Sequence, residues 1–291
     1  MEPIQGGLAS SRRQWTALLL PGSVTLAALF LVPLGMLVVY SFGTTDIVGR
    51  PQLGLTLDNY RLVFQGYNAS VVVRTVEYAL VATACCLVLG YAVAYTAARF
   101  AGRWGGAIVG LVTVSWLVDY LVRIYAWKQL LSDGGFVNQT LDRLGLAPVS
   151  LTGTSLAVVA GLVYGYLPLM VLPLYASLKD LDPSVIDAGK DLFGNPRQTF
   201  LHVTLPATRQ GVIGGCLLVF LPVLGDFATA QFLGGPSNTM IGNIISDQFV
   251  ASGSQTFGSA LAVTLIVLLV LCVAITAVAQ RGRGRVTEVL P

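Results

Sequence analysis

The chain alternates between long apolar stretches and shorter segments rich in Gly, Pro, Asn and Asp. A helix needs about 20 mostly apolar residues to cross the hydrocarbon core of a membrane, because each residue advances it by about 1.5 Å. The stretches that meet this requirement are residues 15–42, 71–97, 105–127, 154–177, 211–233 and 257–280. The polar segments between them read as loops. The pattern therefore predicts an all-α integral membrane protein with six transmembrane helices.

Composition supports this prediction. Apolar residues make up 55% of the chain and charged residues 11%, whereas a soluble domain carries about 25% charged residues. So little charge cannot cover a soluble surface, and membrane lipid is the expected surrounding. The net charge of +3 is too small to indicate a nucleic-acid partner.

Neither the cysteines nor the single histidine indicates a metal site or a disulfide. Cys85, Cys86, Cys216 and Cys272 all fall inside apolar stretches without a CxxC spacing, so we interpret them as small hydrophobic residues. His202 is the only histidine of the chain, which leaves no histidine cluster for a metal.

The basic residues predict the orientation, because Lys and Arg collect in cytoplasmic loops. An N-terminus inside the cell places eleven of the 17 basic residues in the cytoplasm: Arg12, Arg13, Arg99, Arg103, Lys179, Lys190, Arg197, Arg209, Arg281, Arg283 and Arg285. With six spans, both termini are then cytoplasmic. The expected layout is a tail at 1–14, a single transmembrane domain at 15–280 and a tail at 281–291. The first apolar stretch is too long for a cleaved signal peptide, so we expect it to remain as an anchor.

The longest basic loop, residues 177–210, has the pattern of two short helices joined by a turn. Asp182-Pro183 is a helix cap followed by proline at the first helical position. Val185, Gly189 and Leu192 are expected on one face of this first helix, with Asp187 and Asp191 on another. Gly194 is expected to end the first helix. Asn195-Pro196 begins the second helix, which we expect to end before Leu205-Pro206.

This loop resembles the EAA loop of binding-protein-dependent ABC importer permeases. The similar residues are Asp187-Ala188-Gly189, then Gly194 and Pro196, and further on Val203-Thr204-Leu205-Pro206. Asp187 stands where the family has glutamate, Gly189 replaces an alanine, and Phe193 occupies the usual glycine position with Gly194 next to it. The resemblance implies that the loop docks on a cytoplasmic ATPase.

Two further segments narrow the resemblance to spermidine/putrescine permeases. The first is Arg123-Ile124-Tyr125-Ala126-Trp127 with Leu130-Leu131 and Asp133-Gly134-Gly135. The second is Leu224-Gly225-Asp226-Phe227 with Leu233-Gly234-Gly235-Pro236 and Met240-Ile241-Gly242-Asn243.

The resemblance implies a type I ABC importer permease fold in a bacterial inner membrane. The expected partners are a second homologous permease, two copies of a cytoplasmic ATPase and an extracytoplasmic solute-binding protein. The sequence contains no GxxxxGK[ST] phosphate loop, so the chain is expected to be neither an enzyme nor a holder of a cofactor, with ATP bound by the partner ATPase.

Three acidic residues fall within the apolar stretches, where ionisable groups are costly and by default mark a pathway or a buried pair. Glu77, Asp119 and Asp226 each lie roughly 9–12 Å from the outer end of their stretch, which favours a pathway for a cationic solute. The resemblance to spermidine/putrescine permeases implies that this solute is a polyamine. The alternative is local neutralisation, since Arg123 follows Asp119 by four positions and Arg74 precedes Glu77 by three. Asp226 has no basic neighbour in its own stretch.

Four aromatic residues are candidates for cation–π contacts with an amine: Trp116, Tyr120, Tyr164 and Tyr166. Aromatic residues near span ends equally form interfacial belts or pack between helices, and both interpretations stay open.

Two other functions remain as alternatives. An importer of the same class carrying ferric iron, an amino-acid derivative or an oxyanion would show the same loop. An ion-coupled secondary transporter would also carry acidic residues in the membrane, although such carriers have two matching halves that this sequence lacks.

Overall fold

The computed structural model describes residues 7–46, 51–251 and 254–284, with side chains between residues 19 and 278. The tails expected at 1–14 and 281–291 therefore lie partly outside the described residues. The chain divides into two compact units: residues 1–63 with 248–264, and residues 64–247 with 265–291. The two units are described separately.

The first unit begins with a long apolar helix, which a small two-stranded sheet and a short helix follow. Its elements are α1 (Gly7–Ser41), β1 (Thr44–Thr45), β2 (Pro51–Gln52) and α2 (Asp58–Val63). The two strands are antiparallel, with Thr44 opposite Gln52. The side-chain amide of Asn59 donates hydrogen bonds to the carbonyl oxygens of Ser41 (3.1 Å) and Gly43 (2.8 Å). These bonds satisfy carbonyls left free where α1 ends.

The second unit contains most of the helices. They are α3 (Gly66–Arg99), η1 (Gly102–Trp104), α4 (Gly105–Leu117), α5 (Tyr120–Leu131), α6 (Phe136–Arg143), α7 (Ser155–Asp180), α8 (Pro183–Phe193), α9 (Pro196–Thr199), η2 (Phe200–Thr204), α10 (Leu205–Ala207), α11 (Arg209–Leu224), α12 (Ala228–Leu233) and η3 (Pro236–Asn238). Two more helices, α13 (Ile241–Val250) and α14 (Gln255–Gly284), contain the boundaries between the units.

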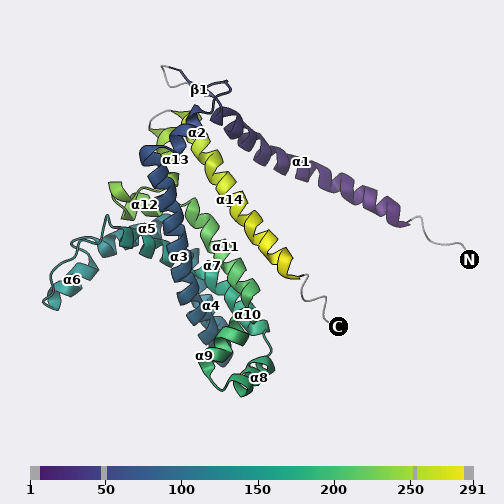
Figure 1. Cartoon of the computed structure of the whole chain (residues 1–291), viewed down its shortest axis with the longest axis vertical. Coiled ribbons are helices and arrows are strands. Elements are labelled where there is room, and N and C mark those ends of the chain that lie inside the picture. Colours follow the sequence, from purple (N-terminus) through teal and green to yellow (C-terminus); the bar gives the residue numbers. More distant parts are fainter. Residues whose placement is uncertain (1–6, 47–50, 252–253, 285–291) are drawn as a thin grey trace, which may run out of the picture. The chain divides into compact units, whose positions relative to one another are not determined.

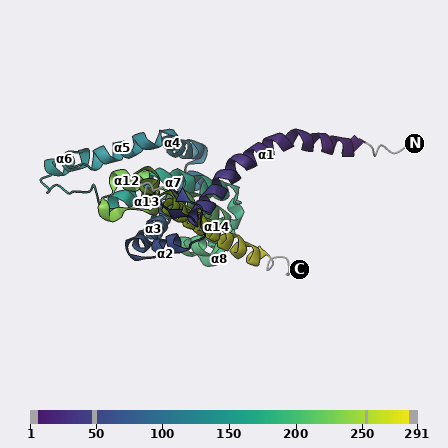
Figure 2. The same ribbon diagram turned by 90° about the horizontal axis from the view of Figure 1, so that it is seen from above.

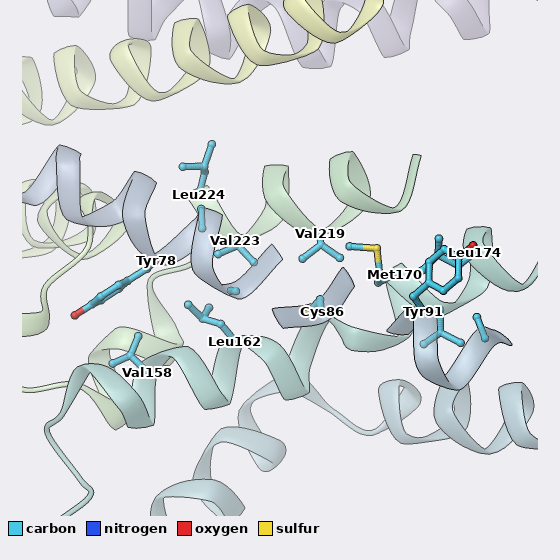
Figure 3. Packing of buried hydrophobic residues seen from close by; sticks show 14 of the residues in the cluster. Tyr78, Cys86, Tyr91, Val158, Leu162, Met170, Leu174, Val219, Val223 and Leu224 are labelled. Atoms are coloured by element: carbon cyan, nitrogen blue, oxygen red, sulfur yellow. The ribbon is translucent and has the colours of Figure 1, made fainter. Parts of the chain in front are cut away.

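The core of the second unit lies where α3, α7 and α11 pack against one another (Figure 1). Small side chains line the buried face of α3 at helical spacing: Ala79, Ala82, Cys86, Gly90, Ala94 and Ala97. Larger side chains from the other two helices fill the space, and Figure 3 shows Leu162, Met170 and Val219 among them. A Cβ at Gly90 would lie 2.9 Å from Cγ of Met170. Small residues let membrane helices approach closely, because packing rather than the hydrophobic effect drives their association.

Four described helices are long and apolar enough to cross a membrane, and there are up to six crossings if each of two bent helix pairs counts as one. The first bent pair, Gly102–Leu117 with Tyr120–Arg143, covers the third predicted span. The second, Pro196–Ala207 with Arg209–Leu224, overlaps the fifth predicted span only along α11. In the second unit, α5 and α6 extend away from α3 and α7 in both views (Figures 1 and 2).

The prediction of one continuous helix over 105–127 is wrong. The helix stops at Leu117, and the segment that follows is bent from it by 92°. The cause lies at Asp119, whose carboxylate accepts hydrogen bonds from the backbone N–H of Leu121 (3.0 Å) and Val122 (3.3 Å). An N-cap of this kind starts a new helix with a new direction.

The helix expected over 211–233 is also broken. It runs from Arg209 to Leu224, and α12 follows after Gly225, Asp226 and Phe227. The side chain of Asp226 accepts a hydrogen bond from the backbone N–H of Thr229 at 2.9 Å. The carboxylate thus accepts a hydrogen bond from the first turn of α12, although Asp226 precedes the N-cap residue Phe227, whereas Asp119 is itself the N-cap residue of α5.

The loop between α7 and α11 has the predicted helix–turn–helix form. The side chains of Asp182 and Asn195 cap α8 and α9, with Pro183 and Pro196 in the first turns. Gly194 ends α8 with a φ of +61°, in the left-handed region where glycine carries no Cβ penalty.

One detail of this loop differs from the prediction. The second helix does not end before Leu205-Pro206, since η2 and α10 carry it to Ala207, and a 70° bend then leads into α11. The buried face of α8 is made by Ile186 and Gly189. Val185 and Leu192 are 43% and 77% exposed.

Candidate functional site

Asp226 is the centre of the candidate site, at the break between α11 and α12. Its side chain is 5% exposed. The break places this carboxylate off the regular helical ladder, where it contacts α5 and α7 as well as its own chain segment.

Three hydroxyl groups converge on one oxygen of Asp226. Oδ2 accepts hydrogen bonds from the hydroxyls of Tyr120 on α5, Tyr166 on α7 (2.9 Å) and Thr229 on α12 (3.0 Å). The Tyr120 and Thr229 hydroxyl oxygens also lie 3.0 Å apart. A carboxylate in an apolar surrounding is stabilised by such donors, because it has lost the water that would otherwise hydrogen-bond to it.

Asp226 lines an open cavity of about 400 Å³. The residues around it come from α4, α5, α7 and α11 together with the segment after α11: Trp116, Val118, Tyr120, Arg123, Gly165, Tyr166, Pro222, Gly225, Asp226 and Phe227. The cavity combines apolar and aromatic walls with one acidic and one basic side chain. This chemistry suits an organic solute that carries charge.

Arg123 faces the same cavity, is 9% exposed, and makes no ion pair among the residues that the structure describes. Its Nε and Nη1 atoms are buried and have no hydrogen-bond partner there. Its guanidinium carbon lies 5.8 Å from the ring centre of Tyr120.

The start of α13 holds the break after α11 in place. The side-chain amide of Asn243 donates to the carbonyl oxygen of Phe227 (2.8 Å) and to Oε1 of Gln231 (2.9 Å). A Cβ at Gly242 would lie 2.9 Å from Cβ of Phe227 and 3.2 Å from the carbonyl oxygen of Asp226. Glycine at 242 therefore allows the close approach that positions the segment carrying Asp226.

A second polar cluster ties the segment before α13 to α3 and α7. Oδ1 of Asn238 accepts hydrogen bonds from Tyr78 (2.9 Å) and Ser155 (2.8 Å), and its Nδ2 donates to the carbonyl oxygen of Gly153 (2.7 Å). Arg74 donates to the carbonyl oxygen of Ser237. These bonds fix the ends of α3, α7 and η3 relative to one another.

The other two acids of the predicted pathway lie elsewhere. Asp119 is exposed and caps α5, so it forms no ion pair with Arg123 and lines no part of the Asp226 cavity. Glu77 is exposed on α3 and also lies outside the cavity lining. Arg74 donates to loop carbonyls of the segment before α13. The alternative of an ion pair between Arg74 and Glu77 is not found among the residues that the structure describes.

Three of the four predicted aromatics line the cavity: Trp116, Tyr120 and Tyr166. Tyr164 points to neighbouring space, where its hydroxyl lies 3.1 Å from Oγ of Ser115 and its ring 5.4 Å from that of Trp127. The sequence did not indicate Thr229, nor that Nε and Nη1 of Arg123 have no hydrogen-bond partner among the residues that the structure describes. The spacing of Asp226 and Thr229 matches a helix cap and could have indicated the former.

The loop between α7 and α11 forms a second candidate site, on the outside of the helices. Asp187 and Ala188 are exposed on α8, and Asp187 pairs with Lys190 at 2.8 Å. This hydrogen bond raises the pKa of Lys190, and the backbone N–H of Ser184 lowers the pKa of Asp182.

The loop is packed from within by small residues. A Cβ at Gly189 would lie 2.9 Å from Cγ2 of Val203 and 3.0 Å from Cγ2 of Thr199. The hydroxyl of Thr199 donates to the carbonyl oxygen of Gly189 at 3.2 Å. Leu205 is partly buried and Pro206 exposed. The close packing explains why glycine stands at position 189.

Comparisons with known proteins agree with this architecture. The spermidine/putrescine transport system permease protein PotB of Escherichia coli (strain K12) is 37% identical over 236 residues, covering 80% of this chain and 86% of that protein. The inner membrane ABC transporter permease protein YdcU of the same organism is 32% identical over 249 residues, covering 81% and 79%. A bacterial ABC transporter that imports alginate has a similar fold, with a TM-score of 0.75 at 15% identity over 94% of this chain and 98% of that one.

These likenesses confirm the all-α, multi-pass fold of a type I importer permease and an inner-membrane location. The relatives are transport permeases rather than enzymes. The family described as "Binding-protein-dependent transport system inner membrane component" matches residues 6–283. This chain belongs to that family of ABC importer permeases.

Proposed function

We propose that this chain forms half of the translocation pathway for a small cationic solute, and that the solute is a polyamine such as spermidine or putrescine. The observation that carries the proposal is the buried carboxylate of Asp226, which faces an open cavity with aromatic walls. An ammonium group is attracted to a carboxylate most strongly where water is scarce. The names of relatives such as PotB point to the same solutes.

The hydroxyls around Asp226 give the site a way to exchange partners. Without solute, Tyr120, Tyr166 and Thr229 satisfy the carboxylate. An arriving ammonium group takes their place on the oxygen, and the tyrosine rings remain beside it for cation–π contact. Trp116 adds a further aromatic wall to the cavity.

The rest of the importer is proposed from the family. A second homologous permease would supply the other half of the pathway, and two copies of an ATPase would bind ATP on the cytoplasmic side. An extracytoplasmic binding protein would deliver the solute. The exposed face of α8, with Asp187, Ala188, Val185 and Leu192, is the surface proposed to dock on the ATPase.

The test replaces Asp226 by asparagine, which keeps the shape and removes the charge. A hydrogen bond to a charged group contributes roughly 1.5–3 kcal/mol, or about 10- to 150-fold in an equilibrium constant. We expect the rate of uptake of labelled putrescine or spermidine into proteoliposomes of the complete transporter to fall, by no more than this range of about 10- to 150-fold.

Asp119→Asn is the matched control, since it makes the same change on an exposed carboxylate outside the cavity, and its uptake should stay near wild type. Glu77→Gln, also outside the cavity, should have a smaller effect than Asp226→Asn. Uptake by Asp226→Asn at the wild-type rate, or ATP hydrolysis stimulated only by an anionic solute, would show that the proposal is wrong.

A further inference from the structure

The positive charge of Arg123 is unexplained by the proposed pathway. Arginine stays protonated in proteins, and its side chain here is 9% exposed with Nε and Nη1 unpartnered among the described residues. A buried charge without a partner is strongly unfavourable. An ion pair among the described residues does not account for it, because neither Asp58–Arg61 nor Asp187–Lys190 involves Arg123.

Arg123 and Asp226 face one cavity without touching. Tyr120 lies between them: its ring is 5.8 Å from the guanidinium carbon, and its hydroxyl donates to the carboxylate. The guanidinium of Arg123 and the carboxylate of Asp226 therefore attract each other through a region of low dielectric, but they do not form a salt bridge. The carboxylate remains available to a third charged group.

From this arrangement we infer that Arg123 is a resident cation that competes with the solute for Asp226 and limits how tightly the solute binds. The inference rests on the proposed function. When an ammonium group enters the cavity, it gains the attraction of Asp226 and the repulsion of Arg123. The repulsion disfavours a second ammonium group in the same space, so the cavity holds one charged end of a polyamine at a time.

A limit on affinity serves transport. A solute must bind well enough to enter a pathway and weakly enough to leave it. A lone carboxylate in a cavity would hold a polycation too tightly for rapid release. Arg123 offsets part of that attraction and is a specificity-determining residue rather than a direct ligand of a cation.

The experiment compares Arg123→Gln with Arg123→Lys, in the complete transporter. Equilibrium binding of labelled putrescine to the purified complex, without the binding protein, gives the dissociation constant, and proteoliposome uptake gives the turnover. Removing a charge in a region of low dielectric should tighten binding by about tenfold and lower turnover, while Arg123→Lys should stay near wild type. Arg123→Met, which keeps the apolar stem, repeats the measurement if the glutamine variant does not fold.

Two controls separate this inference from the proposed function. Arg143→Gln removes a positive charge from an exposed position on α6 and should change neither quantity. In an Asp226→Asn background, Arg123→Gln should tighten binding less than it does with Asp226 present, because the competition for the carboxylate is gone and only the direct repulsion between Arg123 and the ammonium group remains.

Two results would overturn the inference while leaving the proposed function intact, provided that Asp226→Asn still impairs uptake. One is unchanged or weaker putrescine binding by both Arg123→Gln and Arg123→Met. Another is loss of the second permease from the purified complex, which would make Arg123 an interface residue. Arg123-dependent binding of the zwitterion 2-aminoethylphosphonate in preference to putrescine would make the guanidinium a ligand for an anionic group, and would overturn both the inference and the polyamine solute of the proposed function.

Discussion

At the scale of single residues, Asp226 and Asp119 both fall within predicted apolar stretches but have opposite environments in the structure. Asp226 is buried and receives three hydroxyl hydrogen bonds on one oxygen, whereas Asp119 is exposed and caps a helix. Both were candidates for the substrate pathway because each is a charged residue within an apolar stretch. Only the positions of Tyr120 and Tyr166, far away in sequence, distinguish the cavity carboxylate from the cap.

This difference gives a prediction for Asp119. Asparagine caps a helix about as well as aspartate, while alanine costs about 1 kcal/mol. Asp119→Asn should therefore leave the thermal stability of the purified complex almost unchanged, and Asp119→Ala should lower it. Equal and large losses from both variants would indicate that the charge itself is needed, as in a pair with Arg123.

At the scale of elements, hydropathy predicted where apolar helices lie but not where they break. The third and fifth stretches are apolar enough to read as single spans in the sequence, yet each contains an aspartate whose side chain accepts hydrogen bonds from backbone N–H groups at the start of a new helix. Hydropathy averages over a window of about 19 residues, so it does not detect a change of direction that depends on one side chain. The helix–turn–helix loop was predictable in detail because caps, prolines and glycine act locally.

A prediction at this scale concerns the turn after α8. Gly194 has a φ of +61° and no heavy atom within 4 Å of a Cβ at that position, so Gly194→Val strains the backbone without a steric clash. If the loop docks on the ATPase, Gly194→Val should lower solute-stimulated ATP hydrolysis. Asp187→Arg, which reverses an exposed charge on α8, should do the same.

Gly145→Val is the control for backbone strain, since Gly145 has a φ of +71° and equally open surroundings in a different loop. It should leave stimulation near wild type at equal expression. Wild-type stimulation by both loop variants would mean that α8 lies on the membrane surface without coupling to the ATPase.

At the scale of the whole molecule, the sequence predicted the family and a helical multi-pass fold, since these follow from composition, stretch length and loop motifs. The described helices give the predicted six crossings only if each bent pair counts as one. The site depends on contacts between residues 120, 166 and 226, and no local pattern encodes them. The orientation in the membrane remains a prediction from the basic residues.

The orientation can be measured by labelling. The four native cysteines, which are free thiols, are replaced, and Lys190→Cys introduces a single thiol on exposed α8. With the 177–210 loop in the cytoplasm, an impermeant thiol reagent should label this position in inverted vesicles and leave it unmodified in intact spheroplasts. Modification in intact spheroplasts would reverse the predicted topology.

The arrangement around Asp226 also has a consequence for biogenesis. Synthesis proceeds from the N-terminus, so α5 and α7 are made before residue 226. Its carboxylate therefore reaches the membrane when the hydroxyls of Tyr120 and Tyr166 are already present, and only Thr229 of its hydroxyl partners follows. A tyrosine hydroxyl without an acceptor is neutral. Placing it in lipid therefore costs far less free energy than placing a carboxylate there without hydrogen-bond donors. The order of these residues along the chain thus avoids an insertion intermediate in which the Asp226 carboxylate has no tyrosine donors.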